Sequence, residues 1–249
     1  MDLNLKNKIA LVTGSSSGIG KAIASTLSKE GCKVILNSLN LDRLQKTASQ
    51  LNCEYIHGDV STNEKSKYLI ESFIKKYHRL DILVCNVGSG KSKPPGEEDE
   101  EEWLNMLRIN LFSSTNIIKH AHKYLIVSNG VILCISSICG KAALDAPIAY
   151  SGSKAALNSF VQNSARVLAK DGIRINALLP GNINFPGSTW EAKLINREQE
   201  TTSMIEREVP LKRFGNIDEV ATLATVLCSN KIGFVTGALY TIDGGQLRS

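Results

Sequence analysis

Apolar runs alternate with segments of helical periodicity along most of the chain. Short runs of buried-type residues predict strands, and the segments between them, with apolar positions three to four residues apart, predict helices. The predicted strands cover residues 9–13, 34–37, 55–57, 82–85, 131–136, 175–179 and 239–242. The predicted helices cover residues 18–29, 41–51, 63–76, 98–125, 147–170 and 217–228.

This alternation predicts an α/β fold. Right-handed crossovers between successive strands give a parallel sheet with helices on both faces, the doubly wound arrangement of the Rossmann fold. No repeat, low-complexity tract or linker divides the sequence, so we expect a single domain over residues 1–249. Residues 182–210 break the alternation before the last helix. They predict a lid-like insertion that binds substrate, because long segments at the carboxyl edge of a parallel sheet often form substrate loops.

Composition and charge narrow the class of protein. The chain has 249 residues, 43% of them hydrophobic, which suffices for a sizeable core. Its 29 basic and 24 acidic residues give a net charge of +5 without a basic tract, so nucleic acid is not an expected partner. Six cysteines without Cys-x-x-Cys spacing are typical of reduced packing thiols. With no signal peptide and no membrane span predicted, we expect a cytoplasmic protein.

Tyr150 and Lys154 are the first candidates for chemistry. They lie four residues apart in a predicted helix, so both side chains project from one face. A free phenol has a pKa of about 10, and a neighbouring cation stabilises the phenolate, so we expect Lys154 to lower the pKa of Tyr150. The phenol would then exchange a proton with an alcohol or carbonyl near neutral pH. Ser137, thirteen residues earlier, would supply a second hydrogen bond to the substrate oxygen.

A glycine-rich turn, residues 13–20, joins the first predicted strand to the first helix. Backbone N–H groups in such a turn, together with the helix N-terminus, hold a dinucleotide pyrophosphate. The turn and the Tyr–Lys pair together predict a nicotinamide-dependent oxidoreductase. No metal site is expected, because His120 and His122 face different sides of a helix. The acidic run 97–102 precedes a helix, where it complements the positive end of the helix dipole.

The sequence resembles the classical short-chain dehydrogenases/reductases over nearly its whole length, and is similar to their 3-oxoacyl-acyl-carrier-protein reductase members. The resemblance rests on motifs in order and register: residues 13–20, Asp59-Val60, Asn86-Val87-Gly88, Pro180-Gly181 and Asp243-Gly244-Gly245. It implies a catalytic tetrad of Asn110, Ser137, Tyr150 and Lys154. The expected cofactor contacts are Gly14, Ser16, Ser17, Gly18, Ile19, Gly20, Ser38, Asp59, Val60, Asn86, Gly88, Tyr150, Lys154, Pro180, Gly181 and Ile183.

Two of these residues also allow a purely structural interpretation. Asn110 has poor helix propensity in mid-helix, so its side chain can instead satisfy a kink. Asp59 can cap the helix that follows it.

The chain departs from the family pattern at three places. Val87 replaces a usual Ala, and Phe185 occupies a position where Thr often contacts the nicotinamide carboxamide, leaving the backbone of Ile183 for that contact. The second strand ends in residues 36–40 (Leu-Asn-Ser-Leu-Asn), with neither an acidic residue for the adenosine ribose nor an Arg for a 2′-phosphate. Because Ser38 does not repel a phosphate and Arg43 lies one turn into the next helix, we expect NADP(H) to be favoured, with NAD(H) as the alternative.

The expected function is hydride transfer between nicotinamide and a small-molecule carbonyl or secondary alcohol, with Tyr150 as the general acid or base. A sugar or secondary-metabolite dehydrogenase, its pocket shaped by residues 185–190, is an alternative within the family. A non-catalytic dinucleotide sensor or scaffold is an alternative of another class, but its usual mark is a broken tetrad. A homotetramer is expected from the resemblance and from residues 150–170, a segment apolar around much of its circumference.

Overall fold

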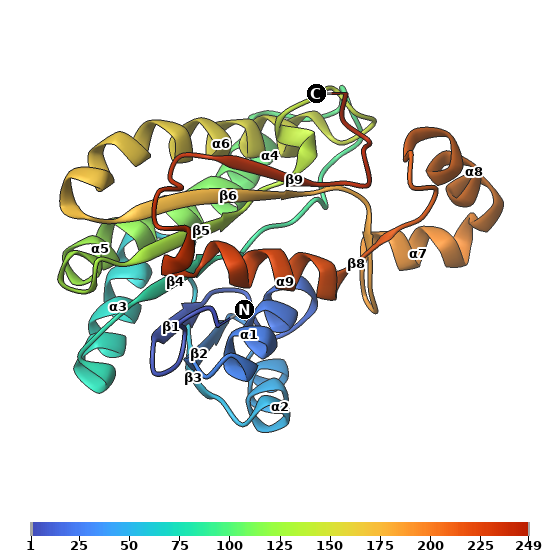
Figure 1. Cartoon of the computed structure of the whole chain (residues 1–249). Coiled ribbons are helices and arrows are strands. Elements are labelled where there is room, and N and C mark those ends of the chain that lie inside the picture. Colours follow the sequence, from blue (N-terminus) through green and yellow to red (C-terminus); the bar gives the residue numbers. More distant parts are fainter. Residues whose placement is uncertain (1, 249) are drawn as a thin grey trace.

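The computed structural model describes residues 2–248, and Met1 and Ser249 lie outside the described residues. Seven parallel strands form one sheet in the order β3-β2-β1-β4-β5-β6-β9 (Figure 1). They are β1 (Ile9–Val12), β2 (Lys33–Ser38), β3 (Glu54–His57), β4 (Ile82–Cys85), β5 (Val131–Ile135), β6 (Arg174–Pro180) and β9 (Leu239–Ile242). Each lies within one residue of its predicted bounds, and the doubly wound sheet is confirmed.

Helices cover both faces of this sheet (Figure 1). The helices are α1 (Gly18–Lys29), α2 (Leu41–Leu51), α3 (Asn63–Tyr77), α4 (Glu100–Leu107), α5 (Ser113–Ser128), α6 (Ile148–Leu168), α7 (Thr189–Asn196), α8 (Glu198–Glu208) and α9 (Ile217–Leu227). Helix α1 packs beside α9 on one face, while α3 packs beside α5, and α4 beside α6, on the other. No helix within residues 2–248 is long and apolar enough to cross a membrane.

Two apolar cores result, one on each side of the sheet. Successive side chains of a strand point to opposite faces. Accordingly Leu11 joins the core beneath α3, α5 and α6, while Ala10 and Val12 join the core beneath α1 and α9. Because both faces of the central strands are buried, their sequences are continuous apolar runs.

The prediction of one continuous helix over residues 98–125 was wrong in the middle of that segment. A π-helical segment, η1 (Arg108–Phe112), separates α4 from α5. The buried side chain of Asn110 lies in this segment, and its Nδ2 donates to the carbonyl oxygen of Met106 at 3.2 Å. A polar side chain that bonds backbone groups competes with the regular helical pattern, and single π turns often occur at functional sites.

The segment that breaks the strand–helix alternation contains three short elements. Strand β7 (Ile183–Asn184) pairs with β8 (Gly215–Asn216) in a separate two-stranded sheet. Helices α7 and α8 follow β7 and lie beyond the carboxyl ends of the large sheet, at the right of Figure 1. Helix α7 contains no buried residue. Three 3₁₀ turns, η2 (Ile138–Gly140), η3 (Ala169–Asp171) and η4 (Asn230–Ile232), were not predicted.

Candidate active site

The candidate site lies where the strand order of the sheet reverses. From β1 the chain proceeds to β2 and β3 on one side, whereas β4, β5 and β6 continue on the other. Loops that leave neighbouring strands in opposite directions open a crevice at the carboxyl edge, which is where doubly wound folds bind ligands. The glycine-rich turn follows β1, and the segment Asn86-Val87-Gly88 follows β4. These two segments therefore flank the crevice.

The glycine-rich turn has the geometry expected of an anion site. Gly14 and Gly18 have φ values of +62° and +55°, which L-residues with side chains rarely adopt. Ser17, the N-cap of α1, is exposed and makes no side-chain capping bond, so the N–H groups of the first helical turn face no side-chain acceptor there. Ile19 lies in the same turn and is half-buried. The residues present fit a dinucleotide pyrophosphate.

Gly20 lets α1 approach the crevice closely. A Cβ atom at this position would lie 2.4 Å from Nδ2 of Asn86 and 2.6 Å from the carbonyl oxygen of Gly14. Asn86 in turn donates from Nδ2 to the carbonyl oxygens of Thr13 and Gly14, at 3.1 and 3.0 Å. The Asn86 side chain thus ties the loop after β4 to the glycine-rich turn, and any side chain at Gly20 would displace it.

Asn110 holds the next part of the same loop. Its Oδ1 accepts a hydrogen bond from the Ser89 N–H at 2.9 Å, and its Nδ2 donates to the Ser89 carbonyl oxygen at 3.1 Å. A Cβ on Gly88 would lie 2.9 Å from the Asn110 Oδ1 and 3.0 Å from the Lys154 Nζ. The structure therefore brings Asn110, Lys154 and the backbone at Gly88 together.

Ser137, Tyr150 and Lys154 meet between β5 and α6. Lys154 is 3% exposed, and its Nζ donates to the carbonyl oxygen of Ile135 at 3.0 Å. The Ser137 side chain lies beside the Tyr150 phenol and lowers its pKa. The Ser137 hydroxyl oxygen also accepts from the Cys139 N–H at 3.1 Å, which fixes it at the start of η2. All four predicted tetrad residues thus surround the crevice.

The pKa values differ from the sequence-based expectation. Burial raises the pKa of Tyr150 to about 12, an effect that the neighbouring Ser137 side chain partly offsets. Burial lowers the pKa of Lys154 to about 8. The expected lowering of the Tyr150 pKa by Lys154 was wrong for this state of the protein. The ammonium points to the Ile135 carbonyl oxygen and is itself disfavoured by burial, so it does little to stabilise a phenolate.

The residues predicted for the adenosine half lie across the sheet from the tetrad. Ser38, at the end of β2, shares a hydrogen bond with Ser16 of the glycine-rich turn, 2.8 Å between the hydroxyl oxygens. The carboxyl end of β3 is four strand intervals from that of β5, about 19 Å at about 4.8 Å per interval. An extended dinucleotide has the length to span this distance.

Asp59 and Val60 follow β3 at the edge of the sheet. Asp59 accepts from the Ser61 N–H at 2.8 Å and forms an ion pair with Lys65 at 3.0 Å, whereas Thr62 is the N-cap of α3. Val60 is buried in the core beneath α3. Every contact of Asp59 in the structure is therefore local, and its role toward adenine stays a prediction.

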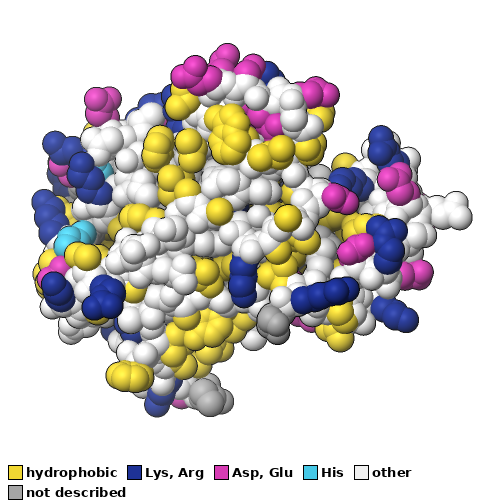
Figure 2. All heavy atoms as spheres, turned by 90° about the horizontal axis from the view of Figure 1, so that it is seen from above, with side chains coloured by type: hydrophobic (Ala, Val, Ile, Leu, Met, Phe, Trp, Pro, Cys, Tyr) yellow, Lys and Arg dark blue, Asp and Glu magenta, His cyan; other side chains and the backbone are white. Residues whose placement is uncertain are grey.

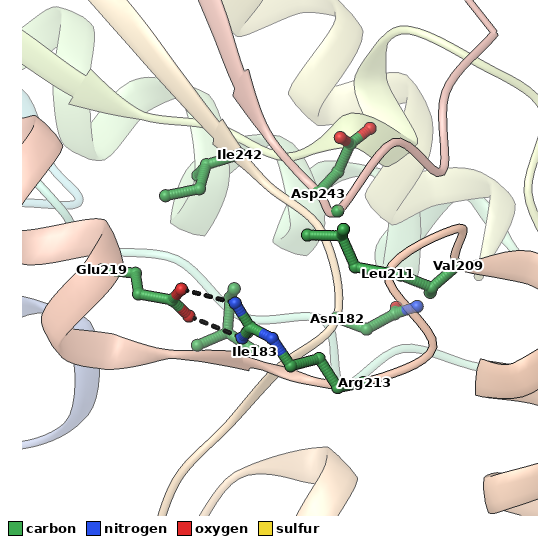
Figure 3. Close-up of a pocket in the computed structure, with 10 residues that line it drawn as sticks. Asn182, Ile183, Val209, Leu211, Arg213, Glu219, Ile242 and Asp243 are labelled. Carbon is green, nitrogen blue, oxygen red and sulfur yellow. Dashed lines mark hydrogen bonds and ion pairs between the residues drawn. The ribbon is translucent and has the colours of Figure 1, made fainter.

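The Pro180–Gly181 turn closes the crevice on the β6 side. A Cβ on Gly181 would lie 2.8 Å from the Asp243 Cβ and 3.4 Å from the Ile138 Cδ1, so this turn lies beside both the C-terminal Asp-Gly-Gly segment and η2. A cavity of about 90 Å³ opens nearby, with the paired side chains of Arg213 and Glu219 on one side (Figure 3). It is lined by Asn182, Ile183, Val209, Leu211, Arg213, Gly215, Glu219, Ile242, Asp243 and Gly244.

Phe185 lies over the glycine-rich turn. A Cβ on Gly18 would lie 2.7 Å from the Phe185 Cε2, so the ring packs directly against the glycine. The sequence indicated that Phe185 departs from the family pattern but not where its ring would lie. The ring spans the distance between β7 and α1, which a threonine side chain is too short to do.

His120 and His122 bond different partners. His120 bonds Asn63 at 3.0 Å, and His122 bonds Asp171 at 2.8 Å. Within residues 2–248, no group of three His, Cys, Asp or Glu side chains is arranged to hold a metal ion.

Sequence reasoning missed Asn158, whose Nδ2 donates to the Gly140 carbonyl oxygen at 3.0 Å. A signal for it was present, because Asn158 follows Lys154 by four residues and Tyr150 by eight and so shares their face of α6.

Known proteins with similar sequences are oxidoreductases, as the arrangement of the site suggests. A family model described as enoyl-(acyl carrier protein) reductase matches residues 14–246. The chain is 34% identical over 249 residues to 3-oxoacyl-(acyl-carrier-protein) reductase FabG of Thermotoga maritima, covering 98% of this chain and 99% of that protein. It is 30% identical over 254 residues to glucose 1-dehydrogenase 2 of Bacillus subtilis, covering 98% and 96%.

Solved structures give the same result. L-sorbose reductase from Gluconobacter frateurii, in complex with NADPH and L-sorbose, superposes with a TM-score of 0.93 at 31% identity over 100% of both chains. A 7α-hydroxysteroid dehydrogenase in complex with NADH superposes with a TM-score of 0.89 at 28% identity, over 100% of this chain and 97% of that chain. The chain belongs to the short-chain dehydrogenase/reductase family. It is a nicotinamide-dependent oxidoreductase of that family.

The buried Lys154 generates a prediction about stability. Its pKa is about 8 in the folded chain, against about 10.4 in an unfolded one. Below pH 8 the Lys154 side chain is charged in both the folded and the unfolded chain, and burying the cation lowers the free energy of unfolding. As pH rises from 8 to 10.4 the lysine is neutral in the folded chain and protonated only in the unfolded one, so this destabilisation disappears. We expect Lys154→Met to exceed the wild type in unfolding free energy by up to about 3 kcal/mol at pH 7.

Urea unfolding at pH 7, 8, 9 and 10 measures this difference. The advantage of the variant should shrink steadily above pH 8. A difference that stays constant over the whole range would mean that Lys154 is not a destabilising buried cation.

Proposed function

We propose that the chain reduces a ketone to a secondary alcohol, with Tyr150 as the proton donor and NADPH as the favoured reductant. One observation carries the proposal: Ser137 lies beside the Tyr150 phenol, and Lys154 and Asn110 flank the backbone at Gly88. A substrate oxygen held between the two hydroxyls would receive two hydrogen bonds as negative charge develops on it. The bound cofactor supplies the hydride.

The pKa of Tyr150 suits proton donation. With a pKa of about 12, the phenol is protonated at neutral pH and is available as the acid for reduction. Ser137, at the start of η2, lies beside Tyr150 and would hold the same substrate oxygen that Tyr150 protonates. We infer that Lys154 stabilises the phenolate after proton transfer, when the negative charge on Tyr150 makes the ammonium form of the lysine favourable.

The proposed substrate is a 3-oxoacyl thioester or a related small ketone. This follows from the names of two relatives, the 3-oxoacyl-(acyl-carrier-protein) reductases of Thermotoga maritima and Aquifex aeolicus. A sugar or polyol is the second candidate, because glucose 1-dehydrogenase 2 and L-sorbose reductase are similar over nearly their full lengths. A non-catalytic sensor is disfavoured, since all four tetrad residues are present and face the crevice.

Several groups support NADP(H) over NAD(H). Ser38 lies where a carboxylate would repel a 2′-phosphate, and its hydroxyl oxygen accepts from the Asn40 N–H at 3.3 Å. Asn40 caps α2, so the positive end of that helix faces the same place, and exposed Arg43 lies in its first turn. Leu39 and Ser17, where basic residues are often found, leave the preference modest.

We infer that residues 182–210 are the substrate lid. The segment starts beside Pro180–Gly181, places Phe185 on the glycine-rich turn, and continues into α7 and α8 beyond the sheet. Trp190 packs on Phe214 with ring centroids 5.5 Å apart, which joins α7 to the chain that follows α8. The scarcity of buried residues in α7 and α8 is typical of segments that open at low free-energy cost.

We further propose a cytoplasmic homotetramer. Six free cysteines fit a reducing compartment. On α6, Ile148 and Val167 are 49% and 61% exposed, and Leu104 and Phe112 are exposed on α4 and η1. Figure 2, which views the molecule from above α4 and α6, has several apolar patches and no continuous basic tract. Burying such patches against another copy is the simplest way to remove them from water.

The first test is a substrate screen with Tyr150→Phe beside the wild type. Acetoacetyl-CoA, L-sorbose, glucose and a 2-enoyl thioester would each be incubated with NADPH and NADH (NADP⁺ and NAD⁺ for glucose), and nicotinamide absorbance followed. Removing the phenol should lower kcat by about a thousand-fold while the NADPH Kd stays within about two-fold, since the hydroxyl acts in proton transfer. Tyr124→Phe, on α5, is the matched control and should keep full activity. Substantial turnover by Tyr150→Phe would reject the assignment.

Cofactor preference is tested with Ser38→Asp. An aspartate here would accept a hydrogen bond from Ser16 and repel a 2′-phosphate, so the NADPH Kd should rise at least about ten-fold while NADH binding is kept or improved. Ser49→Asp adds the same charge to the exposed side of α2 and should change neither affinity. Fluorescence titration with both cofactors provides the measurement. A wild type that prefers NADH would overturn the proposal.

Assembly is tested by light scattering coupled to size-exclusion chromatography at micromolar concentration. We expect four copies of the 27.1 kDa chain. Ile148→Lys together with Leu104→Lys should reduce the measured mass, because buried unpaired lysines are unfavourable. A wild type that elutes only as a monomer would contradict the tetramer.

A further inference from the structure

The short turn that carries Ser137 is pressed against helix α6. Ser137 is the N-cap of η2, and Gly140 ends that turn. A Cβ on Gly140 would lie 2.6 Å from the Lys154 carbonyl carbon and 2.7 Å from the Ala155 nitrogen. The turn therefore contacts α6 one helical turn after Tyr150, at a distance that only glycine permits.

Asn158 fastens this contact. Its Nδ2 donates to the Gly140 carbonyl oxygen at 3.0 Å, and its side chain is 4% exposed. Its Oδ1 is buried without a hydrogen-bond partner among the described residues. Leu157 and Val161, its neighbours on α6, belong to the apolar core. A buried amide with an unpaired acceptor is less favourable than an apolar side chain of similar size, so its one hydrogen bond must account for its presence.

We propose that Asn158 is a positioning residue that holds the Ser137–Gly140 turn on α6 and so directs the Ser137 hydroxyl toward Tyr150. The expected effect on turnover rests on the proposed function. The expected effect on the position of the turn does not. Ser137 and Cys139 belong to the same turn, and the Cys139 N–H donates to the Ser137 hydroxyl oxygen at 3.1 Å. Release of Gly140 would therefore free both side chains together.

Two variants remove the bond in different ways. Asn158→Leu replaces the amide with an apolar group of similar size, and Asn158→Asp keeps the size but replaces the donor with an acceptor. With acetoacetyl-CoA and NADPH, each should lower kcat by about ten-fold and leave the NADPH Kd within about two-fold, because Ser137 acts on the substrate oxygen. In a Ser137→Ala background, with product measured by chromatography, the same change at Asn158 should have less than about a two-fold effect.

Asn176→Leu is the matched control. Asn176 is also a buried asparagine whose Nδ2 donates to a backbone carbonyl oxygen, that of Val235, at 3.0 Å. It lies on β6 and bonds the chain before β9, away from η2. This variant removes a buried hydrogen bond between a side chain and the backbone, as the Asn158 variants do, yet it should keep kcat.

Alkylation of Cys139 gives a readout that needs no turnover. The thiol is half-exposed, and its rate of labelling by iodoacetamide can be followed by mass spectrometry of the peptide that contains it. Both Asn158 variants should label at least about three-fold faster than the wild type, since local opening exposes the turn, whereas Asn176→Leu should not.

The two readouts separate the two proposals. If the wild type turns over no substrate, the proposed function fails while labelling still decides whether Asn158 holds the turn. Unchanged labelling overturns the inference. So does faster labelling without loss of kcat, or a loss of kcat that persists unchanged in the Ser137→Ala background.

Discussion

The hydrogen bond from the buried Lys154 ammonium to the Ile135 carbonyl oxygen is the constraint on which the rest of the site depends. A cation that is almost fully removed from water needs a strong acceptor, and this carbonyl is the one that its Nζ contacts at 3.0 Å. The bond fixes the start of α6 against the end of β5. Tyr150 then lies one helical turn earlier, above the carboxyl edge of the sheet, and Ser137 lies two residues beyond Ile135. The relative placement of Ser137, Tyr150 and Lys154 thus follows from one interaction between a helix and a strand.

The loop after β4 is held beside Lys154 by two asparagine side chains, and both of them hydrogen-bond backbone groups. Asn86 holds the loop to the glycine-rich turn, and Asn110 holds Ser89 by its N–H and its carbonyl together. Gly88 lies between them, where a side chain would meet both Asn110 and Lys154. Both structural features that the sequence suggested for Asn110 are therefore present. Its side chain bonds the Met106 carbonyl oxygen within an irregular helical segment, and it also lies at the candidate site. The π-helical segment is what turns its amide toward the loop.

Much of the fold could be predicted from the sequence because buried parallel strands are apolar on both faces and stand out as continuous runs. The closeness of the four predicted tetrad residues could be foreseen because Tyr150 and Lys154 share a helical face and because the flanking motifs lie in order. The π-helical segment at Asn110 could not be predicted, since periodicity records apolar positions and not which backbone carbonyl a buried amide will bond. The raised pKa of Tyr150 was missed for a related reason. Spacing places a lysine near a tyrosine but does not reveal that the Ile135 carbonyl oxygen accepts the hydrogen bond of the lysine or that burial disfavours the lysine's charge.

Two of the departures from the family pattern lie against the glycine-rich turn. Val87 packs against the glycine-rich turn, with its Cγ2 3.2 Å from where a Cβ on Gly14 would lie, and the Phe185 ring covers Gly18 from the other side. Leu39 adds a third apolar residue at the adenosine end. Each of these three residues is apolar where the family pattern has a smaller or polar residue, so we expect the pyrophosphate to be held mainly by the backbone donors of the glycine-rich turn. With residues 182–210 as the proposed lid, we expect affinity for the dinucleotide to depend on how completely Phe185 and this segment exclude water from the pyrophosphate, because backbone N–H groups bind an anion more strongly as the local dielectric constant falls. On this proposal, the contact of Phe185 with Gly18 would make residues 182–210 and the glycine-rich turn act together in binding the cofactor.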